Sequence, residues 1–220
     1  MLKTTNTSRT VRTVQIAVLA AIVAALQFGS YLWPKIGPVS ISLTLVPIVA
    51  GGITFGVSCG ALLGLVFGIV TLIGCVSGLD FGGGILFAAN PFMTAAICIV
   101  KAVVAGFLAA LVYRALQKKI NPRVSSILAA ITAPVVNTGI FILMTFLFFR
   151  DTLTAWAAGT DLTLYLVTGL AGWNFLIELL LNLALVPALS AVLIKLRRTG
   201  VLRGDSGLTH NKPSLRHVSK

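Results

Sequence analysis

Long apolar runs are the feature of this 220-residue sequence that most limits its possible folds. Apolar residues make up 57% of the chain and charged residues only 10%. A soluble domain of this length cannot bury so many apolar side chains, because a large share of a small globule is surface. The composition therefore excludes a disordered chain, a disulfide-rich secreted module and a conventional soluble enzyme, and it predicts a protein embedded in a lipid bilayer.

The apolar runs predict an all-α membrane protein with six transmembrane helices. Backbone groups in hydrocarbon must bond within their own segment, and no segment has the alternation of a membrane β-barrel. A bilayer core about 30 Å thick is crossed by about 20 helical residues. The expected helices are Val14–Leu32, Ile41–Thr54, Gly56–Val76, Pro91–Leu116, Ser125–Phe149 and Leu164–Leu196. The second is short for a span, and the last is long and contains Gly169, Gly172 and Pro187, which permit a break or kink.

Basic residues predict the orientation of these helices. The net charge is +12, and most of the 17 Lys and Arg residues lie in three clusters, at 3–12, 114–123 and 195–220. With six spans the three clusters share one side of the membrane, and the positive-inside rule makes that side the cytoplasm. We therefore expect a cytoplasmic tail over residues 1–13, a six-helix substrate-binding domain over 14–198 and a basic cytoplasmic tail over 199–220. The positive charge then reports topology, and no nucleic-acid partner is expected.

The chemistry of most enzymes is missing from the sequence. There is no phosphate-binding GxxxxGK[ST] loop, so this chain is not expected to hydrolyse ATP. The only histidines, His210 and His217, lie in the tail, and Glu178 is the only acidic residue within a predicted span. The three cysteines have no CxxC spacing. We therefore expect no catalytic residue, no metal site and no cofactor.

Polar side chains inside the spans are the candidate binding residues. Ionisable groups in a span are costly and usually face a cavity or a partner. Lys101 lies well inside the fourth predicted helix, and Asn174, Glu178 and Asn182 recur at intervals of four on the sixth, so they share one face. One interpretation is structural: Lys101 and Glu178 neutralise each other, while asparagines join helices. The other is a pocket opening outward in which Lys101 meets an anionic solute. In that case the expected solute-binding residues are Lys101, Asn137, Trp173 and Asn174, with Asn90 and Trp33 near the entrance.

Two loops and one helix face complete the pattern. Residues 31–40 contain two prolines, which limit the conformations of this connection. The apolar segment 77–90 contains Gly82, Gly83 and Gly84. We expect the segment 77–90 to be either a lid over the pocket or a loop packed on its neighbours. The first helix carries small-xxx-small ridges, including Ala17, Ala21 and Ala25. Such a ridge serves either internal packing or the docking of another membrane protein.

Several stretches together resemble the S component, the substrate-binding subunit, of energy-coupling factor (ECF) transporters. The resemblance runs from about Arg9 to Arg198 and rests on Ala17–Ala25, Ile41–Val49, Gly60–Gly68, Lys101–Gly106, Pro134–Gly139 and Asn174–Glu178. It implies a six-span subunit of a bacterial cell membrane that binds a water-soluble vitamin near the outer face. It also implies docking on a transmembrane T subunit that carries two ABC ATPases, with Ala17, Ala21 and Ala25 as the docking motif.

The resemblance is strongest to the pantothenate-type branch of that family. Folate, nicotinate and riboflavin stay open as alternative vitamins. A rival of another class is an integral membrane enzyme acting on a lipid or isoprenoid, with Lys101 and Glu178 as its acid–base pair. A second rival is a non-transporting assembly factor that uses only the first helix, which leaves the polar residues inside the membrane without a role.

Overall fold

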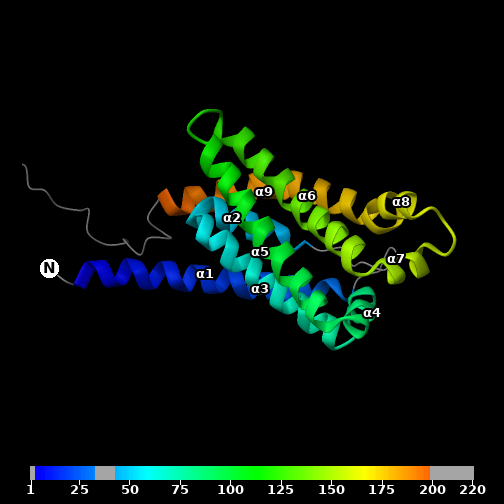
Figure 1. The fold of residues 1–220 in the computed structure, drawn as a ribbon. Helices are drawn as coiled ribbons and strands as arrows, with labels where there is room; N and C mark the ends of the chain where they lie inside the picture. The colour runs from blue at the N-terminus through cyan, green and yellow to red at the C-terminus, as the bar shows by residue number, and fades with distance from the viewer. Residues whose placement is uncertain (1–2, 33–42, 199–220) are drawn as a thin grey trace, which may run out of the picture.

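The computed structural model describes residues 3–32 and 43–198, and every regular element in these ranges is helical (Figure 1). The elements are α1 (Lys3–Ser30), α2 (Leu45–Phe55), α3 (Val57–Val76), α4 (Phe81–Ala89), α5 (Pro91–Leu116), α6 (Pro122–Phe148), α7 (Arg150–Ala157), α8 (Leu162–Tyr165), the π-helical η1 (Leu166–Gly172) and α9 (Trp173–Arg198). The prediction of an all-helical protein is confirmed. Five helices, α1, α3, α5, α6 and α9, are long and apolar enough to cross a membrane.

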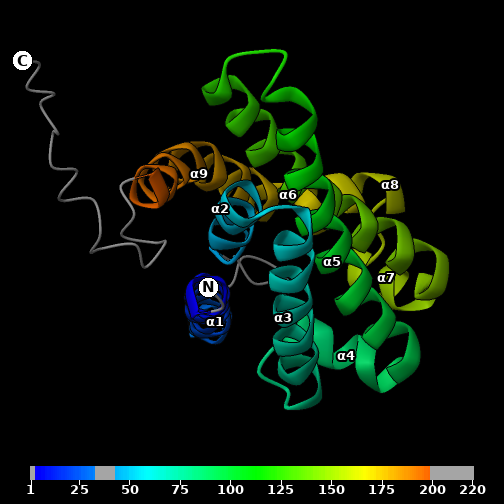
Figure 2. The ribbon, with the colours of Figure 1, turned by 90° about the vertical axis from the view of Figure 1, so that its left-hand side faces the viewer.

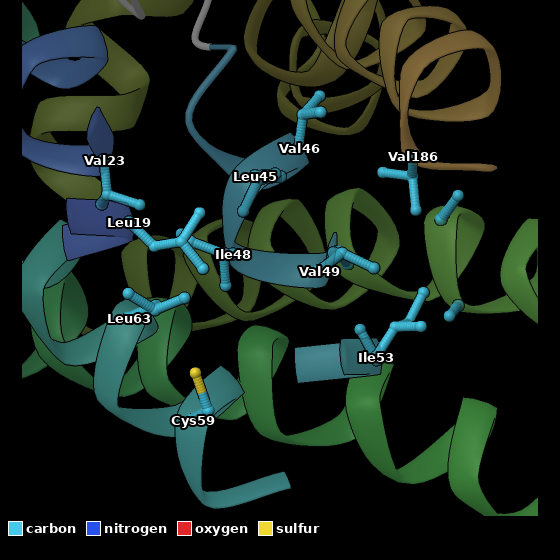
Figure 3. Close-up of a cluster of buried hydrophobic side chains, with 14 of the residues drawn as sticks. Leu19, Val23, Leu45, Val46, Ile48, Val49, Ile53, Cys59, Leu63 and Val186 are labelled. Atoms are coloured by element: carbon cyan, nitrogen blue, oxygen red, sulfur yellow. The ribbon is translucent and has the colours of Figure 1, made fainter. Parts of the chain in front are cut away.

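The short helix α2 lies at the centre of the helical bundle. All 11 of its residues are buried, and it packs against α1, α3, α5, α6 and α9. Figure 3 shows its side chains Leu45, Ile48 and Val49 among those of the neighbouring helices. This helix corresponds to the second predicted span and is as short as the sequence indicated. Whether it counts as a sixth span stays a prediction.

The structure corrects the predicted elements at three places. The first helix starts at Lys3 instead of Val14, because no glycine or proline interrupts the polar residues before the apolar run. The segment predicted as a loop at 77–90 contains the helix α4, which begins after its cap Asp80. The connection before the last helix contains α7. The expected break in the last apolar run is confirmed, since η1 separates α8 from α9 and Gly172 has a positive φ of 24°.

Glycines allow the backbones of α3 and α5 to come into close contact. A Cβ atom at Gly64 would meet the carbonyl oxygen of Ala102, and one at Gly60 would stand 3.2 Å from the Cβ of Ala110. At Gly68 a Cβ would lie 2.7 Å from the carbonyl oxygen of Cys98. Close helix contacts of this kind are typical of packing in lipid. The glycines at 60, 64 and 68 therefore serve internal packing.

The two ends of the bundle differ in what they carry. The N-terminal start of α1 and the C-terminal end of α9 lie at one end, and α4, α7 and α8 gather at the other (Figure 1). Figure 2, seen from the end with the termini, shows α1 beside α2 and α3 at the edge of the bundle. The candidate site lies at the end that carries α4 and α7.

Candidate functional site

A cavity lies beneath α4, between α3, α5, α6 and α7. Its volume is about 40 Å³. Its polar and ionisable lining residues are Thr71 and Cys75 from α3, Asp80 at the start of α4, Thr94, Cys98 and Lys101 from α5, and Trp156 from α7. Leu86, Ile97 and Phe141 supply apolar walls. Apolar walls with a few fixed polar groups are typical of sites for small solutes.

Lys101 brings a positive charge into this cavity. Its ammonium lies 5.1 Å from the centre of the Phe141 ring and 5.8 Å from that of Phe67, which places it over two aromatic faces. Within the described ranges the structure shows no ion pair for Lys101. An ammonium in such surroundings attracts an anion strongly, because few protein groups neutralise it.

Asp80 brings a negative charge to the same cavity, and the sequence analysis missed it as a site residue. Its Oδ1 accepts a hydrogen bond from the backbone N–H of Gly83 at 3.0 Å and so caps α4. An Asp ahead of an apolar segment is a helix-cap signal, and this signal was available in the sequence. The sequence did not indicate that Asp80 would line the same cavity as Lys101.

Two buried thiols lie in the cavity wall. The Sγ atoms of Cys75 and Cys98 are 3.8 Å apart, and both cysteines are free. Asp80 and Lys101 line the same cavity as both thiols, so all four side chains belong to one neighbourhood. The cysteines thus mark the boundary between α3 and α5 at this end of the molecule.

Asn137 lies near the cavity but does not line it. It stands on α6 four residues before Phe141, so both face the same side of the helix. Asn137 is 7% exposed, and its Oδ1 has no hydrogen-bond partner among the described residues. A buried acceptor without a partner costs free energy and calls for an explanation.

The polar stripe on α9 is buried but stands apart from the cavity. Asn174, Glu178 and Asn182 are all buried, as a shared face requires, and Asn182 Nδ2 donates to the Glu178 carbonyl at 2.8 Å. The described lining of the cavity includes no residue of α9. The role of Asn174 in binding and the Lys101–Glu178 pair both stay predictions.

The two predicted entrance residues, Asn90 and Trp33, and the predicted solute-binding residue Trp173 complete the set. Asn90 lies between α4 and α5, where its Oδ1 accepts from the Met93 N–H at 3.1 Å and caps α5. Trp173 is the first residue of α9. Trp33 lies outside the described residues. Their roles in binding stay predictions.

The alanine ridges of α1 divide between the inside and the outside. Ala17, Ala21 and Ala25 are exposed, together with Val14 and other apolar residues of the same face (Val18 and Ile22). Ala20 instead packs on the core. An exposed strip of small side chains is available to a partner helix.

Polar contacts hold α1 at both of its ends. Near the termini, Arg12 Nη2 donates to the Phe55 carbonyl at 2.8 Å. At the other end the Tyr31 hydroxyl donates to the Val70 carbonyl at 3.4 Å and accepts from Gln27 Nε2 at 3.1 Å. Val70 lies on α3 next to the cavity-lining Thr71, so the exposed face of α1 has a fixed position relative to the cavity.

A second hollow, at the opposite end, is lined by residues 52–56 and by Ala110, Tyr113, Arg114 and Gln117 of α5. Its volume is about 260 Å³, and it is more open to the surface than the first. Arg114 is the one charged residue in its described lining. The first cavity is the stronger candidate because it combines enclosure with two opposite charges.

Comparison with known proteins gives two matches. The family described as "ECF transporter, substrate-specific component" matches residues 11–190. The chain is also 28% identical, over 193 residues, to a protein of Lactococcus lactis subsp. cremoris (strain MG1363) named "Pantothenic acid transporter PanT". That alignment covers 83% of this chain and 91% of the relative.

Proposed function

The chain belongs to the family of substrate-specific components of ECF transporters, and from this we propose that it captures a water-soluble vitamin, with pantothenate as the first candidate. As a family member it is a substrate-binding component of a transporter rather than an enzyme. The family match and the apolar helices indicate a membrane protein. We propose that both termini face the cytoplasm of a bacterial cell and that the cavity beneath α4 faces outward.

The observation that carries the substrate proposal is the ammonium of Lys101 in the cavity wall. It contacts two aromatic rings and forms no ion pair with a described carboxylate. Pantothenate carries one carboxylate, which such a group would neutralise through a charge-assisted hydrogen bond. The relative's name supports the same vitamin.

The cavity must enlarge to accept a vitamin. Its volume of about 40 Å³ is that of a few water molecules, whereas small-molecule sites enclose about 300–1,000 Å³. The short helices α4 and α7 cover the cavity and are joined to the rest of the bundle by brief connections. We infer that α4 separates from α3 and α5, and α7 from α6, during entry, and that both close again over the bound solute.

A titration of purified protein against a vitamin panel tests this function. The panel contains pantothenate, folate, nicotinate, riboflavin and thiamine, and binding is measured by calorimetry in detergent or nanodiscs. One vitamin should bind tightly, and we expect it to be pantothenate. Tight binding of another vitamin would change the substrate, and the absence of binding to every vitamin would overturn the function.

Substitution of Asn137 by leucine tests whether its buried oxygen serves the solute. We expect the affinity for pantothenate to fall about fivefold to tenfold, because the enlarged cavity would reach Asn137 and its oxygen would accept a hydrogen bond from the solute. The melting temperature should not fall, since the oxygen has no protein partner to lose. Asn182→Leu is the matched control: its Oδ1 is also buried without a partner, but it lies on α9 away from the cavity. Equal affinities for Asn137→Leu and the wild type would remove Asn137 from the site.

For transport, we propose that the exposed ridge of Ala17, Ala21 and Ala25 docks on a transmembrane T subunit that carries two ABC ATPases. Ala21→Trp should abolish co-purification with these subunits, because the indole fills the space that a partner helix needs. Vitamin affinity should stay at the wild-type value. Ala184→Trp, on the exposed surface of α9, is the control and should co-purify normally. Undiminished co-purification of Ala21→Trp would place the docking face elsewhere.

A further inference from the structure

We propose that Asp80 is a specificity-determining residue that binds hydroxyl donors of the vitamin while Lys101 binds its carboxylate. The inference rests on the proposed function, because it concerns the same cavity. It adds a negatively charged group to the site, opposite the positive charge of Lys101, and narrows the class of solutes that would bind. The cavity would select a small monoanion that has its carboxylate at one end and hydroxyl groups at the other.

The first support is the placement of two opposite charges at one cavity. Asp80 stands at the N-terminus of α4, and Lys101 lies inside α5, yet both line the same enclosed space. The thiols of Cys75 and Cys98, whose Sγ atoms are 3.8 Å apart, line the same space. The sequence positions alone, one in a connection and one in a span, did not indicate this juxtaposition.

The second support is that the two charges do not pair with each other. The structure shows no salt bridge between Asp80 and Lys101, both of which lie in its described ranges. Opposite charges in surroundings of low dielectric attract strongly, so neighbours of this kind usually close into an ion pair. Here the ammonium lies over the rings of Phe67 and Phe141 instead. A solute placed between the two groups would satisfy both.

The third support is the hydrogen-bonding capacity that Asp80 retains. The cap of α4 uses Oδ1, which accepts from the Gly83 N–H. A carboxylate offers about four lone-pair sites on two oxygens and accepts hydrogen bonds only. Its natural ligand partner is therefore a hydroxyl or N–H donor, and not the carboxylate that Lys101 attracts.

Pantothenate has this distribution of groups. Its carboxylate ends the β-alanine half, an amide lies in the middle, and two hydroxyl groups lie on the pantoyl half. Nicotinate has the carboxylate without hydroxyl donors. Pantothenol keeps the pantoyl half and replaces the carboxylate by a hydroxyl group, so it separates the contribution of one pole from that of the other.

The test is a binding matrix of two ligands against four proteins. Pantothenate and pantothenol are titrated into the wild type, Asp80→Ser, Asp80→Asn and Lys101→Met by calorimetry. Serine and asparagine both retain the ability to cap α4, so the helix is preserved. Asparagine removes only the charge, whereas serine also withdraws the acceptor from the cavity.

We expect Asp80→Ser to weaken both ligands about tenfold or more, and Asp80→Asn to weaken both by less. Lys101→Met should weaken pantothenate and leave pantothenol close to its wild-type affinity. Unchanged affinities in both Asp80 variants would overturn the role of Asp80 while the wild type still binds pantothenate. If the wild type binds neither ligand but another vitamin of the panel, the pantothenate assignment fails. The Asp80 variants are then titrated with that vitamin, and unchanged affinity would again overturn the role of Asp80.

Discussion

Gly64→Leu should leave little folded protein. A side chain at this position would meet the carbonyl oxygen of Ala102, and the contact lies between the backbones of two helices rather than against a flexible side chain. The helices would have to separate along the seam that joins α3 to α5. We expect a loss of at least about 3 kcal/mol in the free energy of unfolding, which exceeds the usual effect of a single substitution.

Thermal unfolding in detergent, followed by size-exclusion chromatography, measures this effect. Gly139→Leu is the matched control, because a Cβ at Gly139 meets no atom within 4 Å and this residue of α6 is exposed. The control should unfold at close to the wild-type temperature. A Gly64→Leu protein with the same melting temperature as the control would show that the seam is looser than the structure describes.

Lys101→Met should weaken pantothenate binding by about one to two orders of magnitude. The variant removes the one ammonium among the described lining residues of the cavity and with it a charge-assisted hydrogen bond to the carboxylate. Methionine has a similar length and packs well on aromatic rings, so the contacts with Phe67 and Phe141 persist. Calorimetric titration of the folded variant measures the change.

The melting temperature of Lys101→Met separates the two interpretations of this residue. If Lys101 formed a buried ion pair with Glu178, the substitution would strand a buried carboxylate and cost about 3–5 kcal/mol. We expect no such loss, because α9 does not line the cavity. Lys195→Met, an exposed lysine at the other end of the bundle, is the control and should change neither affinity nor stability.

The helices long and apolar enough to cross a membrane were predictable, because each coincides with a continuous apolar run of the sequence. The start of α5 at Pro91 and the short central α2 follow from such local signals. The helices α4 and α7 were not predicted, because helices of 9 and 8 residues are too short to show a clear periodicity of apolar residues. The glycines of α4 also indicated a loop. At Gly83, however, glycine is needed for α4 to pack on α3, because a Cβ there would meet Cys75.

The site was predictable in part. Lys101 was predictable as a candidate site residue, since a charged side chain within an apolar helix is costly and usually faces a cavity or a partner. Spacing also placed Asn174, Glu178 and Asn182 on one buried face, but spacing does not say which helix that face meets. The same limit applied to α1, whose two alanine ridges have identical spacing although only one is exposed. Asp80 lies in the segment 77–90 that was predicted as a lid or loop, and its place in the cavity depends on how α4 folds over α3 and α5.

Protection of cysteines tests most directly whether the vitamin binds beneath α4. Cys75 and Cys98 line that cavity, while Cys59 is buried in the core among residues of α1 and α2 and serves as an internal control. Purified protein is treated with a small thiol-alkylating reagent, with and without saturating pantothenate, and the rate at each cysteine is measured by mass spectrometry of peptides. We predict that pantothenate slows alkylation of Cys75 and Cys98 and leaves Cys59 unchanged. Alkylation of Cys75 and Cys98 at the unliganded rate, in protein that calorimetry shows to be saturated, would contradict the account.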